Sequence, residues 1–388
     1  MSASRPGTSG RVVTVAAAAL IALAALSCRP LSANLALAVV LISGAVAWRH
    51  GLLAGRPLAR VLWPPLIAFA AASVLSVLFS RDPMASVAAL PRLHVFLIVP
   101  LAAAFLDERW WPRLVAALGT VTMVLAVWGI AQYAAGQTNL LERIRGPMSH
   151  YMTYAGWLLV AVLVLATQLV LRPRWANAWL LLPVALGGVA LLLSYTRNAW
   201  VGLVVGALLL AAVWRRRLLF AYPVLLVAVW LLAPRAVVDR MVSTFDLRQH
   251  ANYDRVCMLV SGVQMIRDNP LTGVGLEMVQ KLYPLYRRDD APRWRVPHLH
   301  NNVVHIGAER GLLGLAAYLW LLAAFFTVTW RGLSRLSGEA RAAVAAALVA
   351  FAGSTAAGLF EYNFFDLEIQ LLTLVLLGVG AGRVEAAA

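Results

Sequence analysis

The sequence predicts an all-α polytopic membrane protein with about twelve transmembrane helices and one large loop. Of its 388 residues, 62% are hydrophobic and only 13% are charged, whereas a soluble domain carries roughly 45–50% apolar and roughly 25% charged residues. A transmembrane helix needs about 20 apolar residues, so this apolar excess excludes an ordinary cytosolic enzyme. The apolar runs also lack the alternating segments of about ten residues that mark an outer-membrane barrel.

Apolar runs bounded by charges and prolines predict the individual spans. The first nine fall within 1–233, a large and partly helical loop occupies 234–300, and the last three fall within 301–388. The first run resembles a signal peptide, but Leu26 stands where a cleavage site would have a small residue, so we expect a retained helix. The predicted spans are 12–27, 31–48, 61–79, 86–106, 114–135, 151–171, 177–195, 198–214, 217–233, 301–328, 341–360 and 367–382.

The distribution of arginine predicts that both termini lie in the cytoplasm. With the N-terminus inside, the short cytoplasmic segments hold sixteen arginines, including Arg215–Arg217, and the short outer segments hold six. Basic residues resist translocation, and long loops are exempt from this rule, so the large loop is predicted on the outer side despite its ten basic residues. We therefore interpret the net charge of +16 as a sign of topology, with membrane lipids as neighbours and no nucleic acid partner.

The spans are nearly free of charged residues, which disfavours a transporter or flippase. Proton relays and coupled transporters usually place ionisable residues inside the membrane, and transporters often show inverted repeats, which we do not see. Cys28 and Cys257 lie far apart and predict neither a metal site nor a disulfide. We therefore expect any chemistry at the outer membrane–water interface.

Part of the large loop has a helical pattern. Residues 253–268 predict a helix that ends at Asn269-Pro270, followed by a turn over 271–275. The aliphatic residues that recur there at helical spacing are Val256, Leu259, Val263 and Ile266.

Two arginines are candidates for an anion site. Arg255 opens the predicted apolar face of the loop helix, where a charge needs a partner; that partner is either Asp254 or Asp246, or a substrate anion. Arg197 lies between two apolar runs with almost no loop. Its rigid fork of donors suits a phosphate, and the alternative is that it extends to the lipid headgroups.

His300 is the candidate base. If a helix begins at His300, about 100° of rotation per residue puts it on one face with Gly307, Gly311 and Gly314. Glycine faces pack closely in membranes, and a neutral imidazole can accept a proton from an attacking hydroxyl. His305 is expected on the opposite side. The alternative is an interfacial histidine that only caps a helix.

Two other outer segments carry polar side chains. Arg143 and Arg145 form a basic loop that ends at His150. We expect His150 at the interface, and the alternative is that it serves a substrate. Glu361, Asp366 and Glu368 form an acidic turn. They either orient an arginine or histidine or balance charge.

These residues resemble those of a known family. His300-Asn301, nine residues and then Gly311-Leu-Leu-Gly314 resemble the His-[Asn/Ser/Gln]-x9-Gly-x-x-[Gly/Thr/Tyr] signature of bacterial O-antigen ligases. Ser194-Tyr-Thr-Arg197 is similar to the family's Ser-x-[Ser/Thr]-Arg segment. Asp254-Arg255 followed by Asn269-Pro-Leu-Thr-Gly-Val-Gly275 is similar to its periplasmic-loop motif. The wider ligase and polymerase superfamily shares much of this pattern.

The resemblance implies a GT-C-like, metal-independent glycosyltransferase of the bacterial inner membrane that needs no cofactor. Its donor would be an undecaprenyl-diphosphate-linked O-antigen and its acceptor the lipid A–core oligosaccharide, joined at the periplasmic face. An O-antigen polymerase and a protein O-oligosaccharyltransferase are the alternatives. His300 would be the catalytic base, and Arg197 and Arg255 would hold the donor diphosphate. We expect four further residues to support the site: Arg145, Arg288, His298 and Asn301.

Overall fold

The structure, a computed structural model, confirms an all-α membrane protein. It describes residues 8–137, 143–220, 223–224, 227, 230–231, 235–243, 246 and 249–388. Within these ranges the elements are helices, and eleven are long and apolar enough to cross a membrane. They correspond to eleven of the twelve predicted spans, whereas the span predicted at 217–233 lies partly outside the described residues.

The helices follow the apolar runs of the sequence, because a chain in lipid must pair its own backbone groups. The α-helices are α1 Thr8–Leu26, α2 Pro30–Arg49, α3 Trp63–Leu78, α4 Pro83–Val87, α5 Ile98–Phe105, α6 Trp111–Ala134, α7 Tyr151–Leu171, α8 Leu181–Leu193, α9 Arg197–Trp214, α11 Arg235–Val242, α12 His250–Asp268, α13 Met278–Tyr286, α14 Asn302–Gly332, α15 Gly338–Ala357 and α16 Leu367–Ala386. Short 3-10 helices are Arg60–Leu62, Leu90–Leu97, Trp175–Leu180 and Arg216–Phe220.

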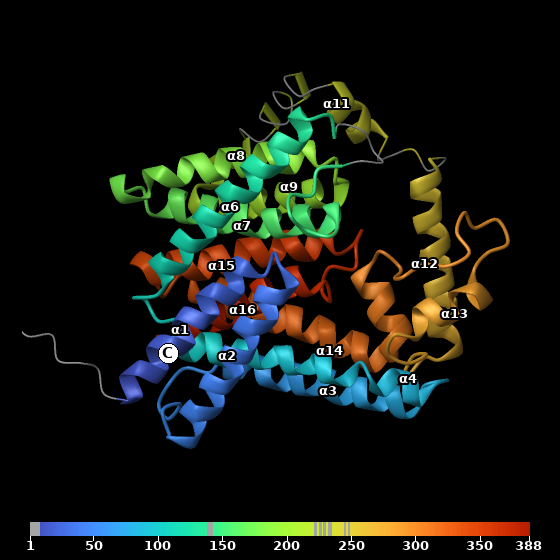
Figure 1. The fold of residues 1–388 in the computed structure, drawn as a ribbon, viewed down its shortest axis with the longest axis horizontal. Helices are drawn as coiled ribbons and strands as arrows, with labels where there is room; N and C mark the ends of the chain where they lie inside the picture. Colours follow the sequence, from blue (N-terminus) through green and yellow to red (C-terminus); the bar gives the residue numbers. More distant parts are fainter. Residues whose placement is uncertain are drawn as a thin grey trace, which may run out of the picture.

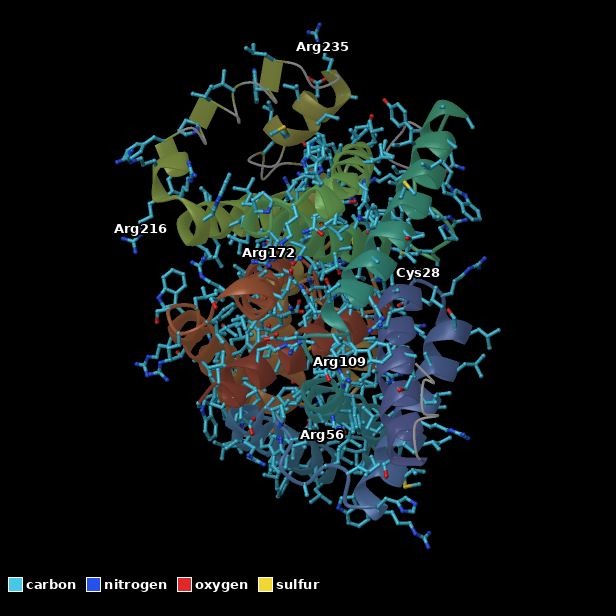
Figure 2. The ribbon with its side chains drawn as sticks, turned by 90° about the vertical axis from the view of Figure 1, so that its left-hand side faces the viewer. Cys28, Arg56, Arg109, Arg172, Arg216 and Arg235 are labelled. Atoms are coloured by element: carbon cyan, nitrogen blue, oxygen red, sulfur yellow. The ribbon has the colours of Figure 1, made fainter. Side chains whose placement is uncertain are left out.

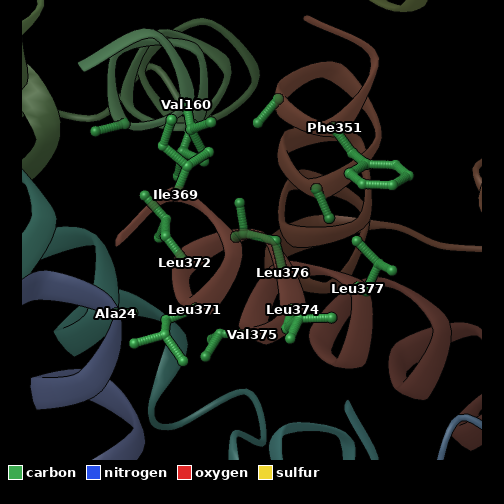
Figure 3. Packing of buried hydrophobic residues seen from close by; sticks show 14 of the residues in the cluster. Ala24, Val160, Phe351, Ile369, Leu371, Leu372, Leu374, Val375, Leu376 and Leu377 are labelled. Carbon is green, nitrogen blue, oxygen red and sulfur yellow. The ribbon is translucent and has the colours of Figure 1, made fainter. Parts of the chain in front are cut away.

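Helices α7, α15 and α16 form the centre of the bundle (Figure 1). Most of their residues are buried, whereas α1, α2 and α8 bury fewer than half of theirs. Figure 3 shows this core, in which Leu372 and Leu376 of α16 share one hydrophobic cluster with Val160 of α7 and Phe351 of α15. The many alanines of α15 allow close helix packing, as small residues generally do in membranes.

The two ends of the bundle differ. Helices α12 and α13 lie at one end, which we name the α12 end (Figure 1). Figure 2 looks onto the opposite end, where Arg56, Arg109 and Arg172 are labelled. The end of α16 is held there by an ion pair between Glu385 and Arg60 at 2.8 Å.

Helix α14 is broken at Gly311, which has φ 63° and ψ −167°. The break frees backbone groups, and the turn after α12 pairs with them. The Val274 N–H donates to the Ala308 carbonyl at 2.8 Å, and the Leu312 N–H donates to the Pro270 carbonyl at 2.7 Å. The predicted turn at 271–275 therefore fills the break in α14 and fixes the entry of that helix against α12.

The predicted loop helix exists as α12, and it ends at Asp268 as Asn269-Pro270 predicted. Its apolar face was predicted wrongly. The buried face carries Met258 and Met265, whereas Val263 is 39% exposed. The reason is that the partners of α12 are α13 and α14, which cover the side with the methionines.

Candidate functional site

Two adjacent cavities lie at the α12 end. One, of about 530 Å³, is lined from α7, α13, the segment before α14 and the α15–α16 connection. The other, of about 70 Å³, is lined from α9, α11 and α12. We name them the large cavity and the arginine pocket. Among the residues that line both are Asn198, Arg293 and His300, so His300 lies at the boundary between the two.

His300 precedes α14 instead of belonging to it. Helix α14 begins at Asn302, and the Asn301 side chain caps it by accepting a hydrogen bond from the Val304 N–H at 2.9 Å. His300 itself has φ 50°. The prediction that His300 shares a helical face with the glycines is therefore wrong, because the asparagine cap starts the helix after it. A left-handed backbone costs a non-glycine residue roughly 1–2 kcal/mol, and such strain clusters at functional sites.

Glu361 fixes the imidazole of His300. Nδ1 of His300 lies 2.8 Å from Oε2 of Glu361, and the two side chains are only 10% and 8% exposed. Burial alone would raise the pKa of Glu361, but the hydrogen bond and charge of His300 lower it to about 2. An ionised carboxylate accepts hydrogen bonds only, so a neutral His300 carries its proton on Nδ1 and leaves Nε2 as an acceptor.

His298 faces the same carboxylate. Its Nδ1 lies 3.5 Å from Oε1 of Glu361, and its ring centroid lies 4.3 Å from that of His300. Burial lowers the pKa of His298 to about 3, so this imidazole is neutral near pH 7. One ligand atom from each of His298, His300 and Glu361 lies within 4.8 Å of the others, as in a metal-binding group. The prediction of no metal stays a prediction.

His305 is held by two partners. The Leu299 N–H donates to its Nδ1 at 3.2 Å, and its Nε2 lies 3.3 Å from Oε1 of Glu309. Glu309 in turn pairs with Arg310 at 2.6 Å. Because both ring nitrogens are engaged, His305 is a structural residue and not a candidate base.

Arg197 and Arg255, far apart in the sequence, line one pocket. Arg197 is the first residue of α9, and its guanidinium donates to the Ser243 carbonyl and to Oδ1 of Asn252. Asp254 pairs with Arg293 at 2.8 Å. Of the described residues that line the pocket, none is acidic, and five are arginines: Arg143, Arg197, Arg240, Arg255 and Arg293. Such a pocket suits an anion with several negative charges.

The comparison with protein families now bears on this site. Residues 182–319 match the family model described as O-antigen ligase. The matched segment contains Arg197, Arg255 and His300.

This match supports membership in the O-antigen ligase and polymerase superfamily. This superfamily indicates a glycosyltransferase-type ligase or polymerase that acts on lipid-linked polysaccharide. A search of curated proteins gave no match.

The four predicted supporting residues do not lie together. His298 lines the large cavity. Asn301 is the cap of α14. Arg288 forms two hydrogen bonds of 2.9 Å with Asp290, and neither Arg288 nor Arg145 lines either cavity. The basic loop instead contributes Arg143, two residues before Arg145.

The sequence analysis did not identify three features of this region. Arg240 and Arg293 were visible only as two of the basic residues of the large loop. Glu361 was noted in the acidic turn, but nothing in the sequence linked it to His300, and it lies outside the matched segment. The pair Glu309–Arg310 lies within a predicted span, so that span is less free of charge than we stated.

Proposed function

We propose that this protein transfers an O-antigen glycan from undecaprenyl diphosphate to the lipid A–core oligosaccharide. One observation carries the proposal. His300, held by Glu361 at 2.8 Å, lies where the arginine pocket meets the large cavity. A base at the boundary of an anion pocket and a polar cavity suits glycosyl transfer, in which a hydroxyl displaces a diphosphate.

The arginine pocket receives the donor diphosphate. Arg197 and Arg255 hold its oxygens, and Arg143 and Arg240 line the same pocket. As the bond between the sugar and the diphosphate breaks, negative charge grows on the leaving oxygen. Preorganised guanidinium groups stabilise that charge without a metal, and two charge-assisted donors on each arginine orient the phosphates.

His300 takes the proton of the acceptor. The acceptor hydroxyl attacks the anomeric carbon of the first donor sugar, its proton passes to Nε2 of His300, and undecaprenyl diphosphate leaves with the bonding electron pair. The Glu361 carboxylate stabilises the imidazolium that forms. The contact between Nδ1 of His300 and Oε2 of Glu361 orients the imidazole so that Nε2 can accept this proton.

The large cavity receives the acceptor. Its wall offers carboxylates and amides, which bind sugar hydroxyls, and an aromatic ring. Examples are Glu277, Gln280, Asn363, Asp366 and Tyr362. Its volume of about 530 Å³ falls in the usual range of roughly 300–1,000 Å³ for small-ligand sites, so it accommodates the end of a glycan but not a whole polymer.

The site lies on the periplasmic side of the inner membrane, with both termini in the cytoplasm. Ser9 of α1 lines a surface cavity with Arg56 and Arg109 at the end opposite to the site, and Glu385 near the end of α16 pairs with Arg60 there. Arginine favours the cytoplasmic side, which supports this orientation.

Helices α9 and α11 both reach the arginine pocket. Helix α9 begins at Arg197 beside the arginine pocket and runs 18 residues to Trp214, about 27 Å at 1.5 Å per residue. Arg240 of α11 lines the same pocket. The span predicted at 217–233 lies partly outside the described residues and stays a prediction.

Transfer in purified components tests the function. The protein, carrier-linked O-antigen and lipid A–core are combined in excess chelator, and the product is resolved on a gel. We expect glycan on lipid A–core. Longer glycan on the carrier would indicate a polymerase, glycan on protein would indicate an oligosaccharyltransferase, and a requirement for added metal would contradict the metal-free mechanism.

A further inference from the structure

The group formed by His298, His300 and Glu361 has the composition of a transition-metal site. Two imidazoles and one carboxylate are a common ligand set for Zn²⁺, which leaves a fourth position for water. Imidazole nitrogen favours zinc, copper or nickel over magnesium and calcium, which prefer oxygen ligands.

The distances fit such an ion. With bonds of about 2.0–2.1 Å in a tetrahedron, the ligand atoms of a zinc site lie about 3.3 Å apart. Here Nδ1 of His300 and Nδ1 of His298 lie 2.8 Å and 3.5 Å from the two oxygens of Glu361, and one ligand atom of each residue lies within 4.8 Å of the others. Small movements of these three side chains would bring their ligand atoms to the spacing of a zinc site.

Two further observations point to a ligand. Nδ1 of His298 is buried and forms no hydrogen bond within the described part of the chain, although its lone pair or proton should have a partner. All three residues also line the large cavity, so an ion can enter from solvent and keep a water on that side.

We propose that His298, His300 and Glu361 bind one Zn²⁺ and that this ion inhibits glycan transfer. Coordination replaces the proton that Nδ1 of His300 shares with Glu361. A neutral imidazole has one ring proton, so coordination at Nδ1 moves it to Nε2. That nitrogen then cannot accept a proton from an acceptor hydroxyl. The inhibitory part rests on the proposed function, whereas the binding part does not.

Binding is tested on the full-length protein in detergent, purified without a histidine tag and stripped with chelator. Titration calorimetry with ZnCl₂ measures stoichiometry and affinity, and Co²⁺ absorption in the visible range reports tetrahedral coordination. We expect one ion per chain and at least tenfold weaker binding in His298→Ala and in Glu361→Gln. His94→Ala is the matched control, because His94 is exposed and lines neither cavity, and it should bind as the wild type does.

Two outcomes overturn the site: no saturable Zn²⁺ binding by the wild-type protein, or wild-type affinity in both cluster variants. Size-exclusion profiles identify a variant that misfolds, in which case the other variant decides. These measurements need no activity, so they stand even if the proposed function fails.

Inhibition is tested in the transfer reaction. Saturating Zn²⁺ should lower the rate of the wild-type protein at least tenfold, and excess chelator should restore it. Each variant is compared with its own rate without metal, and His298→Ala should lose most of its sensitivity. Transfer at an undiminished rate by zinc-loaded protein would overturn the inhibitory role.

Discussion

Two groups of charged side chains at the α12 end differ in how their charges are matched. In the first, Glu309 lies 2.6 Å from Arg310 and 3.3 Å from His305, and its Oε1 accepts the Glu277 N–H at 2.8 Å. Arg310 also donates to the Ser73 hydroxyl at 3.0 Å. This group, which we name the paired network, matches each buried charge with an opposite charge or a hydrogen bond.

The arginine pocket has a different composition, although one of its arginines, Arg293, pairs with Asp254. Five arginines line it, and of the described lining residues none is acidic. Like charges held together raise the free energy of the folded state. A protein retains such an arrangement where an anion completes it.

The difference between these two groups shows that burial alone does not distinguish a charged residue with a function from one with a structural role. Arg310 is as buried as Arg197, but Arg310 pairs with the carboxylate of Glu309, whereas Arg197 donates to the neutral Ser243 carbonyl and Asn252 amide. What separates the two arginines is the balance of charge around them. Substitutions in the paired network should therefore affect folding, and substitutions around the pocket should affect transfer.

The largest expected effect is at His300. His300→Ala removes the proposed base and should lower the rate of transfer roughly 10²–10⁴-fold, with normal membrane insertion. His305→Ala, in the paired network, should lower the thermal unfolding temperature and leave the rate per folded molecule within a few-fold. Transfer by purified protein and thermal unfolding in detergent measure the two effects. A nearly active His300→Ala together with an inactive His298→Ala would assign the base to His298.

The next largest effect distinguishes Arg255, in the arginine pocket, from Arg310, in the paired network. Arg255→Lys keeps the charge and loses the bidentate fork, so transfer should fall about tenfold, mainly through a higher KM for the donor. Arg288→Lys is the matched control, because Arg288 pairs with Asp290 outside both cavities. Arg310→Lys should instead destabilise the fold. Wild-type donor KM in both Arg255→Lys and Arg197→Lys would remove the role of the pocket in binding diphosphate.

A smaller effect tests the framework that supports both groups. Gly311 has φ 63°, and a Cβ there would lie 2.3 Å from the backbone of Leu271. Gly55 has φ 72° with nothing within 4 Å. Gly311→Ala should therefore cost about 1–3 kcal/mol more than Gly55→Ala, because overlap with fixed backbone adds to the cost of the left-handed conformation. Equal losses of thermal stability in the two variants would contradict the tight pairing of the turn with α14.

The sequence predicted those features that depend on a single segment of the chain. Apolar runs predicted the spans, and Asn269-Pro270 predicted the end of α12, because both depend on local chemistry. The motif also directed attention to His300, although the helical reason for it was wrong. No periodicity reveals that Asn301 caps α14 and leaves His300 at φ 50°.

Apart from Arg197 and Arg255, which the resemblance placed on one diphosphate, contacts between distant segments could not be predicted. Glu361 meets His300 only because the connection between α15 and α16 folds onto the start of α14, where the Asn302 N–H donates to the Gly358 carbonyl at 2.8 Å. Likewise, Arg143 reaches the pocket from the segment before α7, and Arg240 reaches it from α11. Such pairings depend on how the helices pack, which one sequence does not encode in any short pattern.

The smallest expected effect concerns Asp366, a buried carboxylate with only one of its two oxygens hydrogen-bonded within the described residues. Oδ2 accepts a hydrogen bond from the Thr153 hydroxyl at 2.6 Å, whereas Oδ1 is buried without a partner in the described part of the chain. Burial, together with the charge of Glu368, raises the pKa of Asp366 to about 7, from an ordinary value of about 3.9.

Since the folded state binds this proton more tightly than the unfolded state, its contribution to stability is present below about pH 4 and is lost as the pH rises through about 7. Asp366→Asn mimics the protonated acid. The variant should therefore gain thermal stability over the wild-type protein as the pH rises from 5 to 8. Asp290→Asn is the control, because Asp290 is exposed and paired with Arg288, which lowers its pKa, and its difference from the wild type should stay constant over that range. A difference for Asp366→Asn that does not grow with pH would mean that Asp366 is ionised in the fold and belongs with the paired charges.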